Sequence, residues 1–296
     1  FFFTQKTAYE MLRSLVGSEM CIRDRGITPS NTNIIDYVEI STLGDALDFG
    51  DSIAIGGLSA GCSSPVKGIF NGGRTESGTW VSRVEEVTIA SKGNSVKFGD
   101  LTVDPGSNAA FSNSVRGFFA GGHTNPNYDS IDPAPVDSIS LSSGGNAVRF
   151  GDLSSKRTST TGTASQTRGF VLGGYYDGSI SNVIEFMTFS TLGNAQDFGD
   201  LSLALRATSG ASSETRAVFA GGYNASPIAY NQGSNQIQFI TMASEGNGTD
   251  FGDLAMDTSF ATSVSNSIRG VFGDGPNSSS PSNAMDFITI STTGDA

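Results

Sequence analysis

The sequence predicts an all-β fold, a β-propeller of four-stranded blades with five full repeats and part of a sixth, and three observations predict it. The triplet Phe-Gly-Asp recurs five times, and equivalent turn glycines recur every 48 to 53 residues. Each repeat holds short runs such as IEFMTFS, with apolar residues on both faces of the pleat. Residues 26–296 show no sustained helical spacing. Sheets stacked face to face around an axis bury both faces.

The repeat over residues 195–246 shows the expected order of elements. A strand rich in small residues near Ala207–Ser213 would line the axis, where little room is left for side chains. Arg216–Gly221 is the second strand, Gly222–Gln236 a loop and Ile237–Ala243 the third strand. A tight turn at residues 244–247 then leads into a short outer strand that ends in Phe-Gly-Asp.

Insertions are confined to one loop of each repeat. From the glycine of Phe-Gly-Asp to the last glycine of the following apolar run the separation is always 23 residues. All variation in length falls in the loop after that glycine. Equivalent loops of a repeat protein lie on one face, so we expect a single variable face.

Asp197-Phe198-Gly199 matches the magnesium-binding triplet of protein kinases. A kinase also needs a phosphate-covering glycine loop, a strand lysine and a His-Arg-Asp loop, and the sequence contains none of these. Lys97 and Arg149 replace the first aspartate in two copies. The triplet therefore belongs to the repeat and is not a metal site.

The charge and the apolar runs exclude two classes of partner. The net charge is −12 and there is no long basic cluster, so we expect no binding to nucleic acid. No apolar run approaches the roughly 20 residues that cross a bilayer, so we expect no membrane insertion. Within residues 26–296 Cys62 is the one thiol, so no disulfide can form inside this part of the chain.

Residues 1–25 are expected to be an artefact outside the fold, with the propeller domain at residues 26–296. The run Met20 to Asp24 is similar to the translation of a transposon-end adaptor used in sequencing libraries. The last residues, STTGDA, stop where earlier copies continue to Phe-Gly-Asp. We therefore expect the repeat array to be incomplete at both ends.

Two sets of charges recur with the repeat. Aspartates follow the turn glycine at Asp51, Asp100, Asp152, Asp200 and Asp253, and basic residues open the second strand at Lys67, Arg116, Arg168, Arg216 and Arg269. They could form a ring of ion sites or an arginine cluster for acidic ligands. We favour a structural role, with aspartate capping turns and an Asp–Arg ladder joining strands or blades.

The variable loops carry the candidate ligand-binding residues. They hold the one tryptophan, the one histidine and five of the seven tyrosines: Trp80, His123, Tyr128, Tyr175, Tyr176, Tyr223 and Tyr230. Aromatic side chains among Asn, Ser and Gly suit recognition of a glycan or a protein. Alternatively, these aromatics cover blade edges and fill gaps between loops. Asp129, Asp132 and Asp137 match no calcium-loop spacing, so we expect no metal and no cofactor.

These features together resemble the kelch repeat of galactose-oxidase-type propellers. The resemblance covers residues 34–296 and rests on a double glycine ending an apolar strand, a variable loop, an aromatic strand and a basic residue before the next repeat. It departs at the outer strand, where kelch repeats favour Trp and this chain has Phe. The copper chemistry of galactose oxidase needs two histidines, whereas this chain has one. The repeated sequence STxGNAxDFGDL is also similar to repeats in structural and tail-fibre-like proteins of marine bacteriophages.

The sequence therefore favours a non-enzymatic binding or structural module. We expect an adhesin-like propeller on a virion or cell surface, with similar sites on successive blades adding as avidity. Two alternatives stay open. One is a propeller enzyme that hydrolyses or cleaves glycans with acidic and tyrosine residues at the axis, and the other is an intracellular scaffold for a protein partner.

Overall fold

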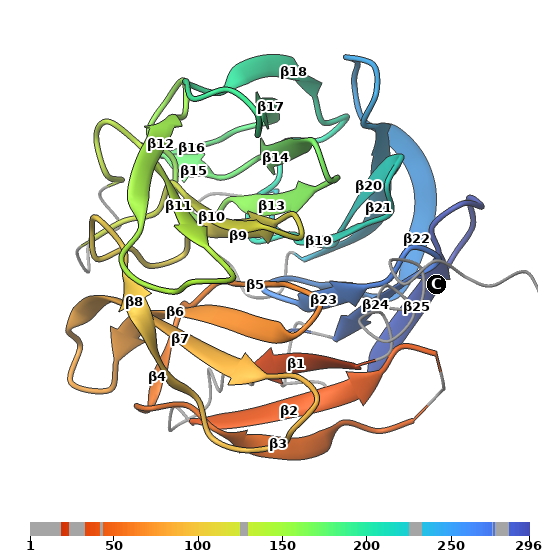
Figure 1. The fold of residues 1–296 in the computed structure, drawn as a ribbon. Coiled ribbons are helices and arrows are strands. Elements are labelled where there is room, and N and C mark those ends of the chain that lie inside the picture. The colour runs from red at the N-terminus through yellow and green to blue at the C-terminus, as the bar shows by residue number, and fades with distance from the viewer. Residues whose placement is uncertain are drawn as a thin grey trace, which may run out of the picture.

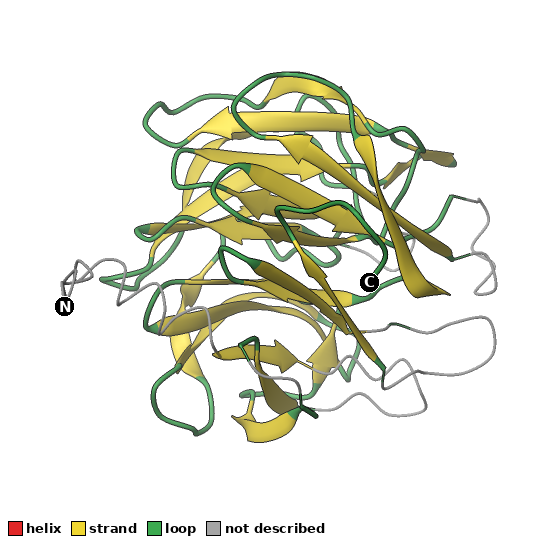
Figure 2. Cartoon of the chain, turned by 90° about the vertical axis from the view of Figure 1, so that its right-hand side faces the viewer, coloured by secondary structure: helices red, strands yellow, loops and turns green. Residues whose placement is uncertain are grey.

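The computed structural model describes residues 19–23, 33–41, 44–124, 130–224, 233–273, 275 and 284–296. Its described residues form strands, turns and loops, with no helix among them, and the strands are arranged as a propeller of small antiparallel sheets (Figures 1 and 2). The predicted all-β propeller of four-stranded blades is confirmed.

Three complete blades follow one another in the middle of the chain. Each runs from an innermost strand to an outer strand in the order β9-β10-β11-β12, β13-β14-β17-β18 and β19-β20-β21-β22. Their bounds are β9 Ala109–Ser112, β10 Arg116–Ala120, β11 Pro135–Ser140, β12 Val148–Asp152, β13 Thr161–Ala164, β14 Arg168–Leu172, β17 Val183–Thr188, β18 Gln196–Asp200, β19 Ser209–Ser212, β20 Arg216–Ala220, β21 Ser234–Thr241 and β22 Thr249–Thr258.

The blade before them has its innermost position shared by two short strands. Both β4 (Gly56–Gly57) and β5 (Gly61–Ser63) pair with β6 (Lys67–Thr75), which is followed outward by β7 (Trp80–Thr88) and β8 (Val96–Asp100). A two-stranded hairpin, β15 (Tyr175–Tyr176) and β16 (Ser179–Ile180), forms a separate small sheet in the loop between β14 and β17.

Three-stranded sheets hold the strands from the two ends of the array. One is β23 (Thr262–Ser265), β24 (Arg269–Gly273) and β25 (Met285–Thr289), and the other is β1 (Glu19–Arg23), β2 (Ile34–Glu39) and β3 (Leu47–Asp51). These two sheets lie next to each other and bring the ends of the ring together (Figure 1). The structure pairs β1 with β2, whereas the expectation that residues 1–25 derive from an adaptor concerns their origin and stays a prediction.

Each sequence repeat is divided between two blades. It gives a third and an outer strand to one blade and then an innermost and a second strand to the next, so that five repeats and β25 account for every described strand except β1 and the hairpin β15–β16. Figure 1 shows β9, β13, β19 and β23 toward the middle of the ring and β12, β18 and β22 toward its rim. The strand rich in small residues near Ala207 is therefore innermost, as predicted.

The hydrophobic cores lie between neighbouring blades. Val218 and Phe219 follow each other on β20, yet Val218 packs with Phe272 of the next blade while Phe219 packs with Phe170 of the preceding one. Between the preceding pair of blades, the rings of Phe118 and Phe189 stack with centroids 4.4 Å apart. Both faces of the second strand are thus buried, which explains why its sequence is apolar without alternation.

The Phe-Gly-Asp triplet makes a joint between the rims of neighbouring blades, which we call the outer joint. In β18, the Phe198 carbonyl accepts a hydrogen bond from Gly246 N–H (2.9 Å), and the Asp200 N–H donates to Asn247 Oδ1 (3.0 Å). The Asp200 carbonyl accepts from Gly248 N–H (2.8 Å). Equivalent bonds join Asp51 to Asn94, Asp100 to Asn146, Asp152 to Asn194 and Asp253 to Asp295.

Glycine is needed at the centre of this joint. A Cβ built on Gly199 would lie 2.5 Å from the Gly246 carbonyl oxygen, and φ of Gly199 is +147°. The Cβ positions of the glycines equivalent to Gly199 would likewise collide with a carbonyl of the next blade. Since backbone meets backbone here, only a residue without a side chain allows the approach.

A second set of contacts, the inner joint, connects the blades before their innermost strands. Five residues other than glycine have φ between +52° and +58° at equivalent positions: Leu58, Ser107, Ser159, Ala207 and Phe260. Ser107 N–H donates to the Leu58 carbonyl (3.0 Å), and Ser159 N–H donates to the Ser107 carbonyl (2.7 Å). Ala207 and Phe260 continue the series at 2.9 Å each. A positive φ costs conformational free energy at each of these residues, and the backbone hydrogen bonds of this series offset that cost.

Candidate binding face

One backbone position on the variable face is fixed by the repeat but differs in side chain. It is the residue directly after the double glycine: Arg74, His123, Tyr175 and Tyr223. Each pairs by backbone bonds with the segment that enters an innermost strand, through Gly57, Gly106, Thr158 and Arg206 respectively. The same backbone pairing therefore holds three chemically different residue types, Arg, His and Tyr, at these four positions.

Trp80, His123 and Arg74 form one aromatic cluster on this face. The rings of Trp80 and His123 meet edge to face with centroids 4.6 Å apart, and Arg74 lies over the indole at 5.8 Å. The imidazole is fully buried, and its Nδ1 is 2.7 Å from Thr158 Oγ1. Burial, with a smaller contribution from the charge of Arg74, lowers the pKa of His123 to about 4. His123 is therefore a neutral structural residue at pH 7, and Trp80 is half-buried against it.

Tyr175 and Tyr223 form a second cluster around Arg206. The guanidinium of Arg206 lies 4.3 Å from the centroid of Tyr175 and 6.0 Å from that of Tyr223. Tyr223 is fully buried and meets Phe260 edge to face at 5.5 Å, whereas Tyr175 is half-buried. Of the two tyrosines, only Tyr175 presents part of its ring to solvent.

Tyr176 is the exposed aromatic of the hairpin β15–β16. It is 41% exposed, and the ammonium of Lys156 lies 4.9 Å from its ring centroid. Lys156 also forms an ion pair of 3.2 Å with Asp132. Hydrogen bonds to Asp132 and then to Tyr176 raise the pKa of Lys156, so it is charged at pH 7. We call Tyr176, Lys156 and Asp132 the hairpin patch.

The structure thus brings the candidate aromatics together only in part. Trp80 and His123 are in contact, Tyr175 and Tyr223 share Arg206, and Tyr176 stands in the hairpin patch. Tyr128 and Tyr230 lie outside the described residues.

The repeated basic residues contact the next blade. Arg168 Nη1 donates to the Met242 carbonyl at 3.1 Å and lies 4.9 Å from the ring of Phe186. Arg116, Arg216 and Arg269 donate in the same way to Phe189, Ile290 and Ile40 carbonyls. Lys67 instead pairs with Glu86 at 2.5 Å. The arginine contacts therefore run to backbone carbonyls and aromatic rings, and not along the Asp–Arg ladder that we expected.

The repeated aspartates use their backbone in the outer joint, while two of their side chains form local pairs. Asp100 pairs with Lys97 at 2.8 Å, and Asp152 pairs with Arg149 within the same strand. In these two copies, a basic residue replaces the first aspartate of the motif, which explains the substitutions at Lys97 and Arg149. These contacts bring basic side chains to the repeated aspartates and no second acidic ligand. They therefore do not support an ion site at these positions.

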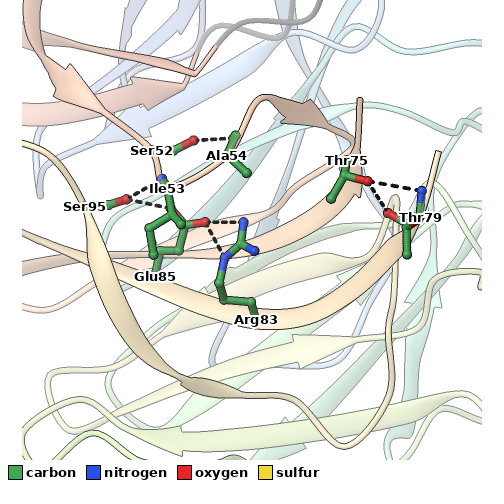
Figure 3. Close-up of polar contacts among 8 residues, drawn as sticks. All are labelled: Ser52, Ile53, Ala54, Thr75, Thr79, Arg83, Glu85 and Ser95. Atoms are coloured by element: carbon green, nitrogen blue, oxygen red, sulfur yellow. Dashed lines mark hydrogen bonds and ion pairs between the residues drawn. The ribbon is translucent and has the colours of Figure 1, made fainter. Parts of the chain in front are cut away.

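Sequence reasoning missed a third repeated position, a hydrogen-bond acceptor within the third strand. Its residues are Glu85, Asp137, Glu185, Gln238 and Asp286, and each accepts a backbone N–H from the segment that arrives from the preceding blade. Figure 3 shows the carboxylate of Glu85 meeting Ile53 N–H, Ser95 and Arg83. Because Glu, Asp and Gln alternate there, the position has no single-letter signature.

Arg157 is the other residue that the sequence did not single out. Its side chain is 2% exposed and pairs with Glu185, which is fully buried. It also donates to the Gly173 carbonyl at 3.0 Å and the Val183 carbonyl at 3.2 Å. Burial lowers the pKa of Arg157, and Glu185 opposes that shift. In other repeats the acceptor at the position of Glu185 bonds to the arriving segment without a buried arginine, as Gln238 does with Ser202. The buried Arg157–Glu185 pair is therefore a feature of this repeat.

The described residues contain no group of three or more His, Cys, Asp and Glu side chains arranged to hold a metal ion. Among the same residues, no helix is long and apolar enough to span a bilayer. A comparison with protein-family models and a search of curated proteins each found no match.

Proposed function

We propose that this chain is a non-enzymatic binding and structural module that recognises a glycan or a protein through its variable face. The observation that supports this proposal is a contrast between the contacts that join the blades and the residues of the variable face. The outer joint repeats Phe-Gly-Asp and the inner joint repeats one backbone conformation, whereas the position after the double glycine presents the side chains of Arg74, His123, Tyr175 and Tyr223 on the variable face. A rigid scaffold with varied loop residues is the usual design of a recognition surface.

The hairpin patch is the part of this face best suited to contact a ligand. Tyr176 exposes an aromatic ring, while Lys156 and Asp132 supply hydrogen-bond donors and acceptors beside it. An aromatic ring flanked by polar groups matches the apolar face and hydroxyl groups of a sugar ring. It equally matches an exposed peptide segment, so a glycan and a protein are both included in the proposal.

The use of the buried carboxylates supports a binding role over catalysis. Glu85, Asp137 and Glu185 accept hydrogen bonds from backbone amides of the preceding segment, and Glu185 also neutralises Arg157. A general acid or base needs a carboxyl group that is directed at a substrate. These three carboxylates are directed at the frame of the protein.

We also propose that the repeat is a kelch-type variant, in which Phe takes the place of the outer-strand Trp. The double glycine and the basic residue of the second strand support this relationship. The sequence of the repeat supports two further parts of the proposal. One is an adhesin-like role on a virion or cell surface, and the other is the similarity to repeats of marine bacteriophage structural proteins. They would place several similar faces on one assembly, where weak contacts add.

A glycan array and a protein-capture screen against intact cells test the proposed function. We expect saturable binding that falls about tenfold or more in Tyr176→Ala and Lys156→Ala. The matched control is Leu192→Ala, because Leu192 is 75% exposed in a turn at the other end of the third strand. Turnover of a glycan on the array would contradict the proposal, as would binding that is equal in all four proteins.

A further inference from the structure

One asparagine of the outer joint, Asn247, is followed by glycine. In three other copies of the joint the asparagine is followed by Ser or Ala: Asn94-Ser95, Asn146-Ala147 and Asn194-Ala195. Gly248 has no Cβ, so its backbone nitrogen approaches the side chain of Asn247 with the least steric hindrance. Asn247 is therefore the joint asparagine whose side chain is most open to attack by its own backbone.

The reaction that an Asn-Gly pair undergoes is deamidation through a cyclic imide. The backbone nitrogen of Gly248 gives its proton to the solvent and bonds to Cγ of Asn247. The Cγ–Nδ2 bond breaks, and Nδ2 takes a proton from the solvent and leaves as ammonia. Water then opens the imide at either carbonyl, which leaves aspartate or isoaspartate at position 247. Asparagine and water are thus converted to an acidic residue and ammonia, and no other reactant is consumed.

The closed outer joint holds both reacting groups in other contacts. The Gly248 N–H donates to the Asp200 carbonyl (2.8 Å), and Asn247 Oδ1 accepts from the Asp200 N–H (3.0 Å). The nitrogen of Gly248 has to leave the first bond before it can attack Cγ. The reaction therefore starts when the joint between β18 and the turn from β21 to β22 opens, and its rate reports that opening.

The chain contains one other Asn-Gly pair, Asn71-Gly72, which provides an internal comparison. Asn71 is fully buried, and its Nδ2 donates to the Pro105 carbonyl and to Asn108 Oδ1, at 3.2 Å each. Asn247 is exposed in its turn, where water reaches it. Opening of the outer joint leaves the contacts of Asn71 in place, so the two pairs should react differently in the folded protein.

We propose that Asn247 is a site of spontaneous deamidation in the folded protein, reached when the outer joint beside β18 opens. The two products differ in their effect on this joint. Aspartate keeps an acceptor in place, since Asp295 Oδ1 accepts the Asp253 N–H at 3.1 Å in another copy. Isoaspartate adds one carbon to the backbone before Gly248 and moves its N–H out of register with the Asp200 carbonyl. The isoaspartate form therefore loses the joint, and the aspartate form keeps it.

Incubation of the whole chain at mildly alkaline pH, followed by peptide mapping with mass spectrometry, tests this proposal. We expect conversion at Asn247 but not at Asn71 in the folded protein, and conversion of both in urea. Urea should speed the reaction at Asn247 about tenfold or more, because the joint no longer holds the Gly248 nitrogen. Gly248→Ala, which supplies the alanine of two other copies, should slow the reaction in urea about tenfold or more.

Gly199→Ala weakens the same joint without changing the Asn-Gly pair. Its Cβ would lie 2.5 Å from the Gly246 carbonyl oxygen, so the folded variant should deamidate several-fold faster at Asn247 and remain unmodified at Asn71. The matched control is Gly193→Ala, whose Cβ would meet nothing within 4 Å and which should react as the unchanged protein does. Equal conversion of the two asparagines in the folded protein would overturn the proposal. An unchanged rate in Gly199→Ala would overturn it too, as would no conversion of Asn247 over a period that converts it fully in urea.

Urea denaturation of the products tests the effect on the joint. Chromatography of the incubated protein separates the isoaspartate form, and Asn247→Asp supplies the aspartate form. We expect the isoaspartate form to unfold at a lower urea concentration than Asn247→Asp, which should unfold close to the unchanged protein. Equal midpoints for the two forms would contradict the loss of the joint in the isoaspartate form.

Discussion

Gly199 and Gly193 share an unusual backbone angle but differ in what surrounds them. Their φ values are +147° and +154°, so either glycine is strained by replacement with Ala. A Cβ on Gly199 would meet the Gly246 carbonyl at 2.5 Å, whereas a Cβ on Gly193 would meet nothing within 4 Å. The difference between the two replacements therefore isolates the cost of separating two blades.

We expect Gly199→Ala to destabilise the protein by about 2 kcal/mol or more beyond Gly193→Ala. Urea denaturation of the two variants measures that difference. Equal losses of stability would mean that the glycine of Phe-Gly-Asp serves its own backbone angle and not the outer joint.

The buried pair of Arg157 and Glu185 has a natural counterpart in the next repeat, where Leu205 and Gln238 occupy the same positions. Glu185→Ala should cost about 3–5 kcal/mol, because it leaves a buried guanidinium uncompensated. The double variant Arg157→Leu with Glu185→Gln should recover most of this loss. Chemical denaturation of the three proteins checks the coupling, and a double variant as unstable as the single one would contradict it.

His123 makes stability depend on pH in a defined window. Its pKa is lowered from 6.5 to about 4 in the folded protein, so the unfolded chain binds its proton more readily. The stability gained by keeping the imidazole neutral is fully present above pH 6.5. It is lost as the pH falls toward 4, which lowers the free energy of unfolding by up to about 3 kcal/mol. His123→Gln should remove this part of the pH dependence. Because the chain has one histidine, the difference between the two stability profiles reports it directly, and parallel profiles would refute it.

At the scale of the element, the second strand joins its blade to the next one through its first residue. Arg216 donates to the Ile290 carbonyl at 3.1 Å and lies 4.6 Å from the ring of Phe239. The planar guanidinium makes both contacts at once, which a lysine side chain does less well.

Arg216→Ala should lower the free energy of unfolding by about 1–2 kcal/mol, and Arg216→Lys should be intermediate between the unchanged protein and Arg216→Ala. Ligand binding by the variable face should stay unchanged in both variants. Thermal denaturation and the glycan array together test both parts. Retained stability with lost binding would show that the repeated arginines serve a ligand.

The elements were more predictable than their joints. Strand order, the innermost strand near Ala207 and the outer strand at Phe251 follow from spacing and apolar pattern, because local composition encodes them. The reason for Gly199 was not accessible, since its neighbour Gly246 lies 47 residues away. Among the candidate ligand residues, sequence could not separate the buried Tyr223 from the half-buried Tyr175, because each directly follows the double glycine of its own repeat.

At the scale of the whole molecule, two series of backbone contacts hold successive blades together. The inner joint runs through Ser107, Ser159, Ala207 and Phe260, and the outer joint repeats at each Phe-Gly-Asp. Hydrophobic cores between neighbouring blades lie between these two series of contacts. The repeated backbone contacts therefore build a frame, and side chains of the variable face, which differ between repeats, are available for recognition.

Native-state hydrogen exchange of the backbone amides tests this account most directly. It predicts slow exchange at Ser107, Ser159 and Ala207 in the inner joint and at Asp152 and Asp200 in the outer joint, with rates close to those of β14 and β20. Fast exchange at these amides, with protection confined to the strands, would contradict the claim that the repeated motifs join the blades.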